Sequence, residues 1–370
     1  MKYTEENLKE YIGKIAGLDR AAMEQARRRQ AQLAKPPGSL GKLEELSVQL
    51  AGITGKIQNH IGKKRLLIFA ADNGVVAEGV SSAPQEVTLS QSVNLTRGKT
   101  GAAVLANHFG CELIVCDVGI NANSGETAIL DRKIACGTNN IAHGAAMTRE
   151  AAVQAVMTGI ELAAAAADEG VDVIGIGEMG IGNTTTSSAV LTALTGAPVE
   201  TVTGRGGGIT DAGYEKKLEV IRRALQINQP DKNDPLDVLS KVGGFDLTAM
   251  TGAFIGGAAA RVPAVIDGLI SAAAALCAVR LCPAVRDFLI PSHASSEAGY
   301  AVAAGALGIE PLFTLGMRLG EGSGCPLAFE VLGAACAVMN KMATFEEAGI
   351  DDRYLDEIRT SGALCKKGER

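Results

Sequence analysis

Hydrophobic and polar positions divide the chain into a helical first part and a longer part built from short apolar runs. From residue 4 to about 57, apolar residues recur at helical spacing, most clearly in residues 18–35 and 42–53. Pro36 and Pro37 interrupt this pattern, because proline disfavours helical backbone in the residue before it. We therefore expect helices separated by a turn at these prolines.

Short apolar runs begin at residue 65 and alternate with helical segments. They lie at 65–72, 112–119, 171–178, 198–204, 262–267, 287–292 and 311–316, the fourth being the weakest. Uninterrupted runs of this kind suit parallel strands buried on both faces, with the helices as right-handed crossovers. The pattern predicts an open, Rossmann-like α/β/α sandwich with a mostly parallel sheet. We expect this domain to span residues 61–325, with residues 1–60 and 326–370 forming a smaller helical domain.

Composition and charge are typical of a soluble α/β enzyme. Of 370 residues, 47% are hydrophobic, with 45 glycines and no tryptophan, so we expect a large core of small aliphatic side chains. A formal net charge of −6 without long basic runs argues against nucleic acid or an anionic membrane surface as a partner. No apolar segment reaches the roughly 20 residues that cross a bilayer. The charged N-terminus lacks the apolar core of a secretory signal, and we expect a cytoplasmic protein.

Cysteine and histidine spacing gives no indication of a metal site. The eight cysteines include no Cys-x-x-Cys pair, and the four histidines show no His-Glu-x-x-His spacing. We expect reduced structural thiols and no catalytic zinc.

Polar and glycine-rich residues follow several of the predicted strands. They lie at 72–74, 177–180, 204–206, 292–293 and 318–326. Ligands of open parallel sheets bind beyond the carboxyl ends of the strands, so we expect these segments to converge on one edge of the sheet.

The segment GEMGIGNTTTSSAV follows a predicted strand and opens a helix. Gly180 and Gly182 allow close backbone approach, and the amides that begin the helix suit an anion. Asn183 and Thr184 can cap this helix. The segment departs from the dinucleotide fingerprint, because Thr185 stands where a third glycine belongs. We predict a phosphate site, and the alternative is tight packing between helix and strand.

The segment GRGGGITDAGYEKK offers a second set of anion contacts. Arg205 stands among Gly204, Gly206 and Gly207. Lys217 lies in the helix that follows. Backbone donors combined with cations suit a phosphate or carboxylate, whereas the alternative is a glycine-rich turn before an exposed charged helix.

The loop after the first predicted strand carries neutral polar side chains. Ser82, Gln85 and Gln91 can line a pocket with hydrogen-bonding groups.

Ser292 and His293 lie near the start of another predicted helix, too close in sequence to form a Ser-His-acid triad by themselves. No G-x-S-x-G motif is present, and we predict helix capping there instead.

Glu321 stands among three glycines in RLGEGSG, directly after the last predicted strand. Glycines permit close approach of a ligand, and a carboxylate held there can accept a proton from it. Glu178 is the second carboxylate expected at this edge. The alternative for Glu321 is an ordinary surface turn.

Six motifs occur together and in order: KPPGSLGKLE, ADNGVVAEGVSSAPQEVT, GEMGIGNTT, GRGGGI, IPSHASSE and RLGEGSG. Across residues 35–340 the chain resembles the nicotinate-nucleotide:dimethylbenzimidazole phosphoribosyltransferase family. The resemblance implies a homodimeric, metal-independent enzyme that needs no cofactor. It further implies transfer of 5-phosphoribose from nicotinate mononucleotide to a benzimidazole-type base, giving α-ribazole 5′-phosphate and nicotinate in assembly of the cobalamin nucleotide loop.

The family motifs, placed on this sequence, imply roles for particular residues. Glu321 becomes the general base and Glu178 a second acidic residue near base and ribose, while Lys217 matches a basic residue of the active site. Substrate contacts are implied at Ser82, Gln85, Gln91, Gly180, Gly182, Asn183, Thr184, Gly204, Arg205, Gly206, Gly207, Lys217, Ser295, Leu319 and Gly320. This chain has Ala83 before Pro84 where the family often has serine, so a hydroxyl contact to the base is not implied there.

Two other functions remain open from the sequence alone. A related phosphoribosyltransferase could use a purine or a phenolic acceptor, and a non-catalytic nucleotide-binding module could use the same phosphate site. The presence of both Glu178 and Glu321 favours an enzyme.

Overall fold

A computed structural model describes residues 2–123, 125 and 128–356 of the chain. The chain forms two compact units, one of residues 1–16 and 63–328 and the other of residues 17–62 and 329–370. The first unit contains the sheet and the candidate site. The second contains α2 (Arg20–Gln32) and α3 (Lys42–Thr54), and α14 (Cys325–Lys341) begins in the first unit and continues into the second.

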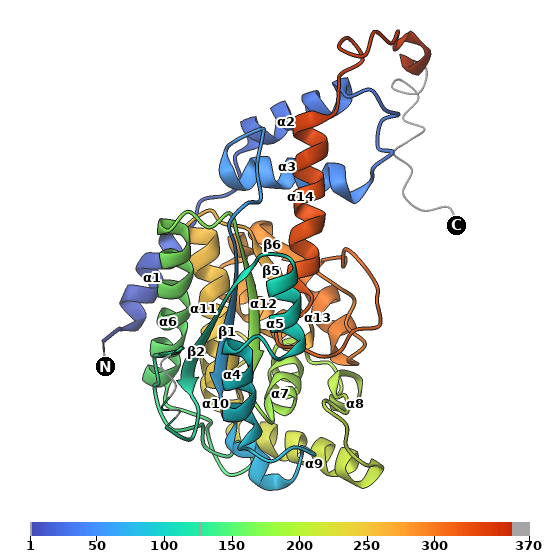
Figure 1. The fold of residues 1–370 in the computed structure, drawn as a ribbon. Coiled ribbons are helices and arrows are strands. Elements are labelled where there is room, and N and C mark those ends of the chain that lie inside the picture. Colours follow the sequence, from blue (N-terminus) through green and yellow to red (C-terminus); the bar gives the residue numbers. More distant parts are fainter. Residues whose placement is uncertain (1, 124, 126–127, 357–370) are drawn as a thin grey trace. The chain divides into compact units, whose positions relative to one another are not determined.

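Six parallel strands form the sheet of the first unit (Figure 1). They are β1 (Lys64–Ala71), β2 (Glu112–Gly119), β3 (Ile129–Asp131), β4 (Val173–Met179), β5 (Ala264–Ile266) and β6 (Leu289–Pro291). Their order is β3-β2-β1-β4-β5-β6, and every paired strand is parallel to its neighbour. This confirms the predicted Rossmann-like α/β fold. The strand order reverses between β1 and β4, where ligands of such sheets bind.

Helices cover both faces of the sheet. The helices of this unit are α1 (Glu5–Gly13), α4 (Val87–Thr96), α5 (Gly101–His108), α6 (Arg149–Asp168), α7 (Asn183–Thr195), α8 (Val199–Val202), α9 (Asp211–Asn228), α10 (Pro235–Val242), α11 (Phe245–Ala259), α12 (Leu269–Leu281) and α13 (Gly299–Leu307). Short 3-10 helices are η1 (Gly74–Glu78), η2 (Pro283–Phe288) and, near the C-terminus, η3 (Arg353–Leu355). Figure 1 shows α4 and α5 in front of the strands, with α11 and α12 behind them. None of the helices in the described ranges has the length and hydropathy needed to cross a membrane.

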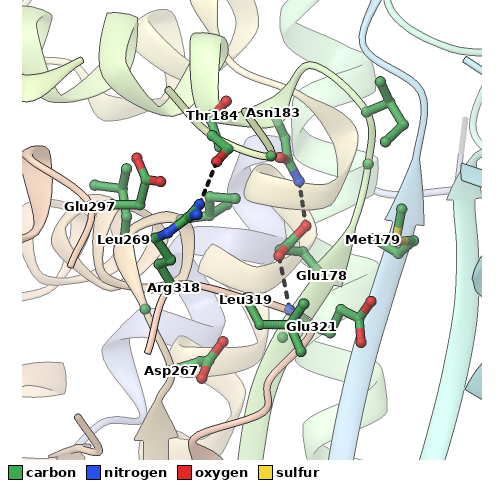
Figure 2. Close-up of a pocket in the computed structure, with 18 of the residues that line it drawn as sticks. Glu178, Met179, Asn183, Thr184, Asp267, Leu269, Glu297, Arg318, Leu319 and Glu321 are labelled. Atoms are coloured by element: carbon green, nitrogen blue, oxygen red, sulfur yellow. Dashed lines mark hydrogen bonds between the residues drawn. The ribbon is translucent and has the colours of Figure 1, made fainter. Parts of the chain in front are cut away.

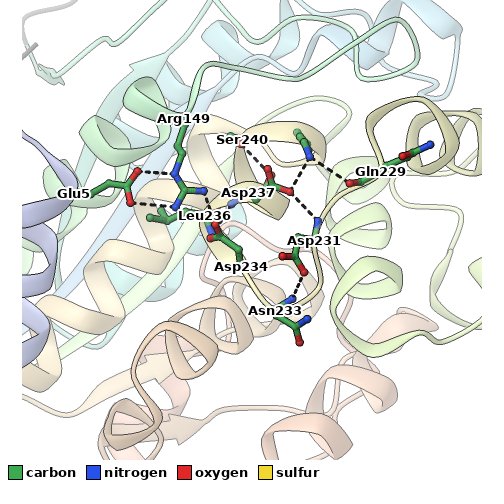
Figure 3. A network of polar contacts seen from close by, with 10 residues as sticks. Glu5, Arg149, Gln229, Asp231, Asn233, Asp234, Leu236, Asp237 and Ser240 are labelled. Atoms are coloured by element: carbon green, nitrogen blue, oxygen red, sulfur yellow. Dashed lines mark hydrogen bonds and ion pairs between the residues drawn. The ribbon is translucent and has the colours of Figure 1, made fainter.

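Residues 1–16 belong with the sheet, although the sequence pattern grouped them with the helical segment 1–60. Helix α1 packs against α6 and α11 with Leu8 buried, and an ion-pair network also joins it to α6 (Figure 3). Arg149 at the start of α6 contacts Glu5 of α1 at 2.5 Å and Asp234 at 2.6 Å. Long-range ion pairs of this kind leave no trace in the hydrophobic pattern.

Two of the predicted strands are wrong and one strand was missed. Residues 199–202 form the single helical turn α8, because the buried Val199 and Val202 are three positions apart and pack on neighbouring helices rather than in a sheet. Residues 311–316 contribute only an isolated bridge between Phe313 and His293. In the missed strand β3, polar residues begin at Asp131, directly after Ile129 and Leu130, so the segment shows no recognisable apolar run.

Two glycines bring the turn at residues 320–324 directly against the sheet. A side chain at Gly177 in β4 would place its Cβ 2.6 Å from the Gly322 backbone. A Cβ on Gly322 would lie 2.6 Å from the Leu66 side chain of β1. Both positions therefore require glycine, and their contact fixes the turn that carries Glu321 beside β1 and β4.

Candidate active site

A cavity of about 500 Å³ opens at the carboxyl ends of β4 and β5. Of the residues singled out in the sequence, those that line it are Ser82, Glu178, Gly180, Gly182, Asn183, Thr184, Gly206, Gly207, Ser295, Leu319, Gly320 and Glu321. These residues come from five separate segments of the chain. The position is beyond the carboxyl ends of the strands, as expected from the sequence, and next to the strand-order reversal between β1 and β4.

The other five predicted residues lie outside the cavity wall. Arg205 is half-exposed and donates to the Ile209 carbonyl at 2.9 Å and the Asp211 carboxylate at 2.5 Å. Gln85 bonds the Asp72 carboxylate. Both side chains therefore bond residues near them in the sequence and do not line the cavity.

Lys217, Gly204 and Gln91 lie immediately behind the wall. The Lys217 ammonium donates to Thr184 Oγ1 at 2.9 Å and to the Gly204 carbonyl at 3.2 Å. Gln91 donates from Nε2 to Glu321 Oε1 at 3.4 Å. Each of the three thus contacts or supports a lining residue.

Several residues of the site were not found from the sequence. Asp267, Glu297 and Arg318 line the cavity, and Asp246 lies behind Glu178. Asp267 directly follows an apolar run, so the rule of polar residues after strands could have found it. Asp246 lies in the first turn of α11, distant in sequence from every motif, and no sequence signal indicates it.

Glu178 is buried near the centre of the site and is bonded on both carboxylate oxygens (Figure 2). Asn183 Nδ2 donates to one oxygen, and the Glu321 backbone N–H donates to the other at 3.2 Å. Asn183 also donates to Asp246 at 3.0 Å. Burial, reinforced by the Asp246 charge, raises the pKa of Glu178 to about 8. The Glu178 carboxyl is therefore mainly protonated at neutral pH.

Glu321 lies in an unusual backbone conformation. Gly320, Glu321 and Gly322 have consecutive φ angles of 81°, 58° and 76°. A left-handed conformation is uncommon for a residue with a side chain, and it persists where surrounding contacts determine it. The glycines before and after it can adopt this conformation without the steric cost of a Cβ.

The Glu321 carboxylate is mostly buried but incompletely paired. Its Oε2 has no hydrogen-bond partner within the described part of the chain. Burial raises the pKa of Glu321, while the nearby polar groups of the Ala102 backbone, Thr100 and Gln91 lower it. A carboxylate with a raised pKa and an unused oxygen is suited to accept a proton.

Cationic and amide donors gather on the other side of the cavity, where Figure 2 shows Thr184, Arg318 and Glu297. Lys217 is 1% exposed, and burial lowers its pKa to about 8. Arg318 donates to the Gly206 carbonyl at 3.1 Å. The Glu297 carboxylate partly balances both cations.

The start of α7 differs from the expected cap. Gly182, with φ 94°, is the N-cap residue and no side chain caps the helix. Asn183 instead bonds the buried carboxylates, and Thr184 accepts from Lys217. The Asn183 and Thr185 amides bond the Gly180 and Gly182 carbonyls at 3.2 and 2.9 Å. Among the first three amides of α7, that of Thr184 therefore keeps its donor capacity for an anion in the cavity. Within the described residues, no three metal-ligating side chains come together.

Stability should depend on pH through Glu178. Its pKa of about 8 in the folded chain compares with 4.5 for an ordinary glutamate. The unfolded state loses this proton first, so the group's contribution to stability falls as pH rises from about 5 to 8. Glutamine has no such proton. We expect the Tm of Glu178→Gln, relative to wild type, to rise steadily across this interval.

Thermal melts of both proteins at several pH values test this expectation. Altered hydrogen bonds in the variant would change Tm by an amount that does not depend on pH. A Tm difference that stays constant between about pH 5 and 8 would contradict the raised pKa.

Comparison with known proteins identifies the family. A family model described as phosphoribosyltransferase matches residues 15–350. A nicotinate-nucleotide–dimethylbenzimidazole phosphoribosyltransferase from Clostridium perfringens is 50% identical over 352 residues, which are 95% of this chain and 98% of that protein. This chain belongs to that family. The family predicted from the six motifs is thereby confirmed, and the protein is a phosphoribosyltransferase.

Two further members agree with this assignment. The enzyme of the same name from Desulforudis audaxviator is 51% identical over 350 residues, covering 94% of this chain and 99% of that protein. The crystal structure of CobT from Thermus thermophilus is 41% identical, with a TM-score of 0.86, covering 90% of this chain and 99% of that one.

Proposed function

We propose that this phosphoribosyltransferase transfers 5-phosphoribose from nicotinate mononucleotide to dimethylbenzimidazole or a similar base. The products are α-ribazole 5′-phosphate and nicotinate, used in assembly of the cobalamin nucleotide loop. One observation carries the proposal. A single cavity has the incompletely paired carboxylate of Glu321 on one side. On the other side, at the start of α7, it has hydrogen-bond donors for an anion. Two relatives that share about half of their residues with this chain are named for this reaction, which supports the proposal.

The nucleotide phosphate binds, in this proposal, at the start of α7. Thr184, whose amide has no partner among the described residues, lines the cavity together with Arg318. Lys217 reaches Thr184 from behind, so a small movement of its ammonium brings it to a phosphate oxygen. Helix amides combined with cations are the usual donors for phosphate.

Glu321 acts as the general base toward the acceptor. An imidazole nitrogen becomes an effective nucleophile when its N–H proton is removed as positive charge builds on the ribose. Apolar side chains of Met179, Ile270 and Leu319 line the same cavity and suit a flat aromatic base. Ala83 also lines it, so no hydroxyl group is offered to the base from this position.

The reaction proceeds by direct displacement and inversion. The acceptor held at Glu321 attacks C1′ opposite the departing nicotinate, which converts a β-nucleotide into an α-riboside. Double displacement would require a nucleophile that forms a covalent ribosyl intermediate. Glu178 is the nearest candidate, but both of its oxygens are bonded and burial favours its protonated, weakly nucleophilic form.

Product analysis tests the proposed function. Purified protein with nicotinate mononucleotide should release nicotinate only when a benzimidazole-type base is added. Proton NMR of the anomeric position should show an α-riboside. No nicotinate release with any base indicates a binding module, and preferred use of a purine or phenol indicates the related transferase. A β-riboside or a trapped ribosyl-Glu178 contradicts direct displacement.

The predicted homodimer and cytoplasmic location stay predictions.

A further inference from the structure

Asp267 is a buried carboxylate for which the proposed reaction supplies no direct role. It follows β5 and is 2% exposed. Its main chain is held on both sides, since its N–H donates to Ser271 Oγ at 3.2 Å and its carbonyl accepts from Ser292 Oγ at 3.1 Å. The Asp267 carboxylate therefore projects from a fixed point at the end of the sheet.

Both oxygens of this carboxylate bind the turn that carries Glu321. Oδ2 accepts from the Gly322 N–H at 3.0 Å, and Oδ1 accepts from the Gly324 N–H at 2.7 Å. Glu178 accepts the N–H of Glu321 itself at 3.2 Å. Three backbone N–H groups of one turn thus point at two buried carboxyl groups.

The left-handed backbone at Glu321 explains why such contacts matter. A residue with a side chain costs roughly 1–2 kcal/mol in this conformation and requires surroundings that hold it there. The remaining contacts of the turn include bonds from Ser323 to Gly320 and from Cys325 to Gly322, each 3.0 Å long. Those bonds close the turn but do not attach it to the sheet.

We propose that Asp267 is a positioning residue, which holds the 320–324 turn so that the Glu321 carboxylate lies at the proton it removes. This inference rests on the proposed function of Glu321. Asp267 acts through the backbone of the turn and need not touch substrate. Its loss would let the turn relax from its left-handed conformation, and displacement of a catalytic group by about 1 Å costs up to 100-fold in rate.

Asp267→Asn tests the proposal, because an amide can accept from only one of the two N–H groups and opposes the other. We expect kcat to fall roughly 10- to 100-fold. The KM for nicotinate mononucleotide should change less than about threefold, since the phosphate contacts at α7 are separate from the turn. Asp117→Asn is the control, because Asp117 is a buried aspartate near the end of β2 whose Oδ1 accepts two backbone N–H groups, at 3.0 and 2.8 Å, while its Oδ2 pairs with Lys133 at 3.1 Å. We expect that control to lose stability without a comparable fall in kcat.

A double-variant cycle separates positioning from general damage. If Asp267 acts only through Glu321, then Asp267→Asn should reduce kcat less than about threefold in a Glu321→Gln background. Equal reductions in both backgrounds would overturn the proposal, as would a kcat of Asp267→Asn near that of wild type. A near-normal kcat of Glu321→Gln alone would instead refute the proposed role of Glu321. If Asp267→Asn fails to fold, the same comparison is made with Asp267→Ser, which keeps one acceptor oxygen. The same criteria then apply.

Discussion

Replacing Glu321 by glutamine is expected to lower kcat roughly 100- to 10,000-fold, the usual contribution of a positioned general base. Glutamine keeps the shape of the side chain and its contact with Gln91, but it cannot accept the proton of the acceptor base. Folding should be preserved because the turn is held by its backbone. Nucleotide binding should be preserved because the phosphate contacts lie on the other side of the cavity.

Steady-state kinetics with nicotinate mononucleotide and dimethylbenzimidazole measure this effect. Glu219→Gln, an identical substitution at an exposed position of α9, serves as the control and should leave kcat unchanged. The pH profile gives a second reading, since the acidic limb of wild-type kcat reports ionisation of the base and should disappear in the variant. A kcat for Glu321→Gln within about threefold of wild type would exclude the base assignment.

Replacing Lys217 by methionine should lower kcat/KM for nicotinate mononucleotide roughly 10- to 100-fold. A charge-assisted hydrogen bond to phosphate contributes about 1.5–3 kcal/mol, and each 1.4 kcal/mol corresponds to tenfold. Methionine preserves most of the buried volume, so the α7–α9 packing around Lys217 should survive. The neighbouring Lys216 is exposed on the same helix, and Lys216→Met is therefore the matched control with little expected effect.

A substrate that lacks the phosphate tests whether Lys217 contacts that group. Nicotinate riboside should be used much less well than the mononucleotide by the wild-type protein. Its residual turnover should be the same in Lys217→Met and in wild type, because the missing ammonium has no phosphate to contact. Equal losses for both substrates would show that Lys217 supports the fold of the cavity and does not bind phosphate.

The sheet was predictable because its long strands are buried on both faces. Runs such as 65–72 and 112–119 stay apolar at most positions, and a central parallel strand imposes that pattern. The predicted strand at 198–204 was wrong because Val199 and Val202 lie on one side of a single helical turn, and a short apolar run can be buried in either structure. Strand β3 was missed because Asp131, Arg132 and Lys133 directly follow Ile129 and Leu130, so no longer apolar run marks it.

The sequence by itself indicated five of the segments that meet at the site and the carboxylate that we propose as the base, but not the segment that follows β5. Glu321 among its glycines and the GEMGIGNTT segment are local features, since a turn or a helix start depends on residues adjacent in sequence. Only the tertiary structure decided how those segments are held. Asp267 reaches a turn more than 50 positions away in sequence, Lys217 approaches Thr184 from behind, and Arg205 turns toward Asp211 at the start of α9. Each of these outcomes depends on which buried groups the fold brings within hydrogen-bonding distance, and residues far apart in the chain carry no local mark of that proximity.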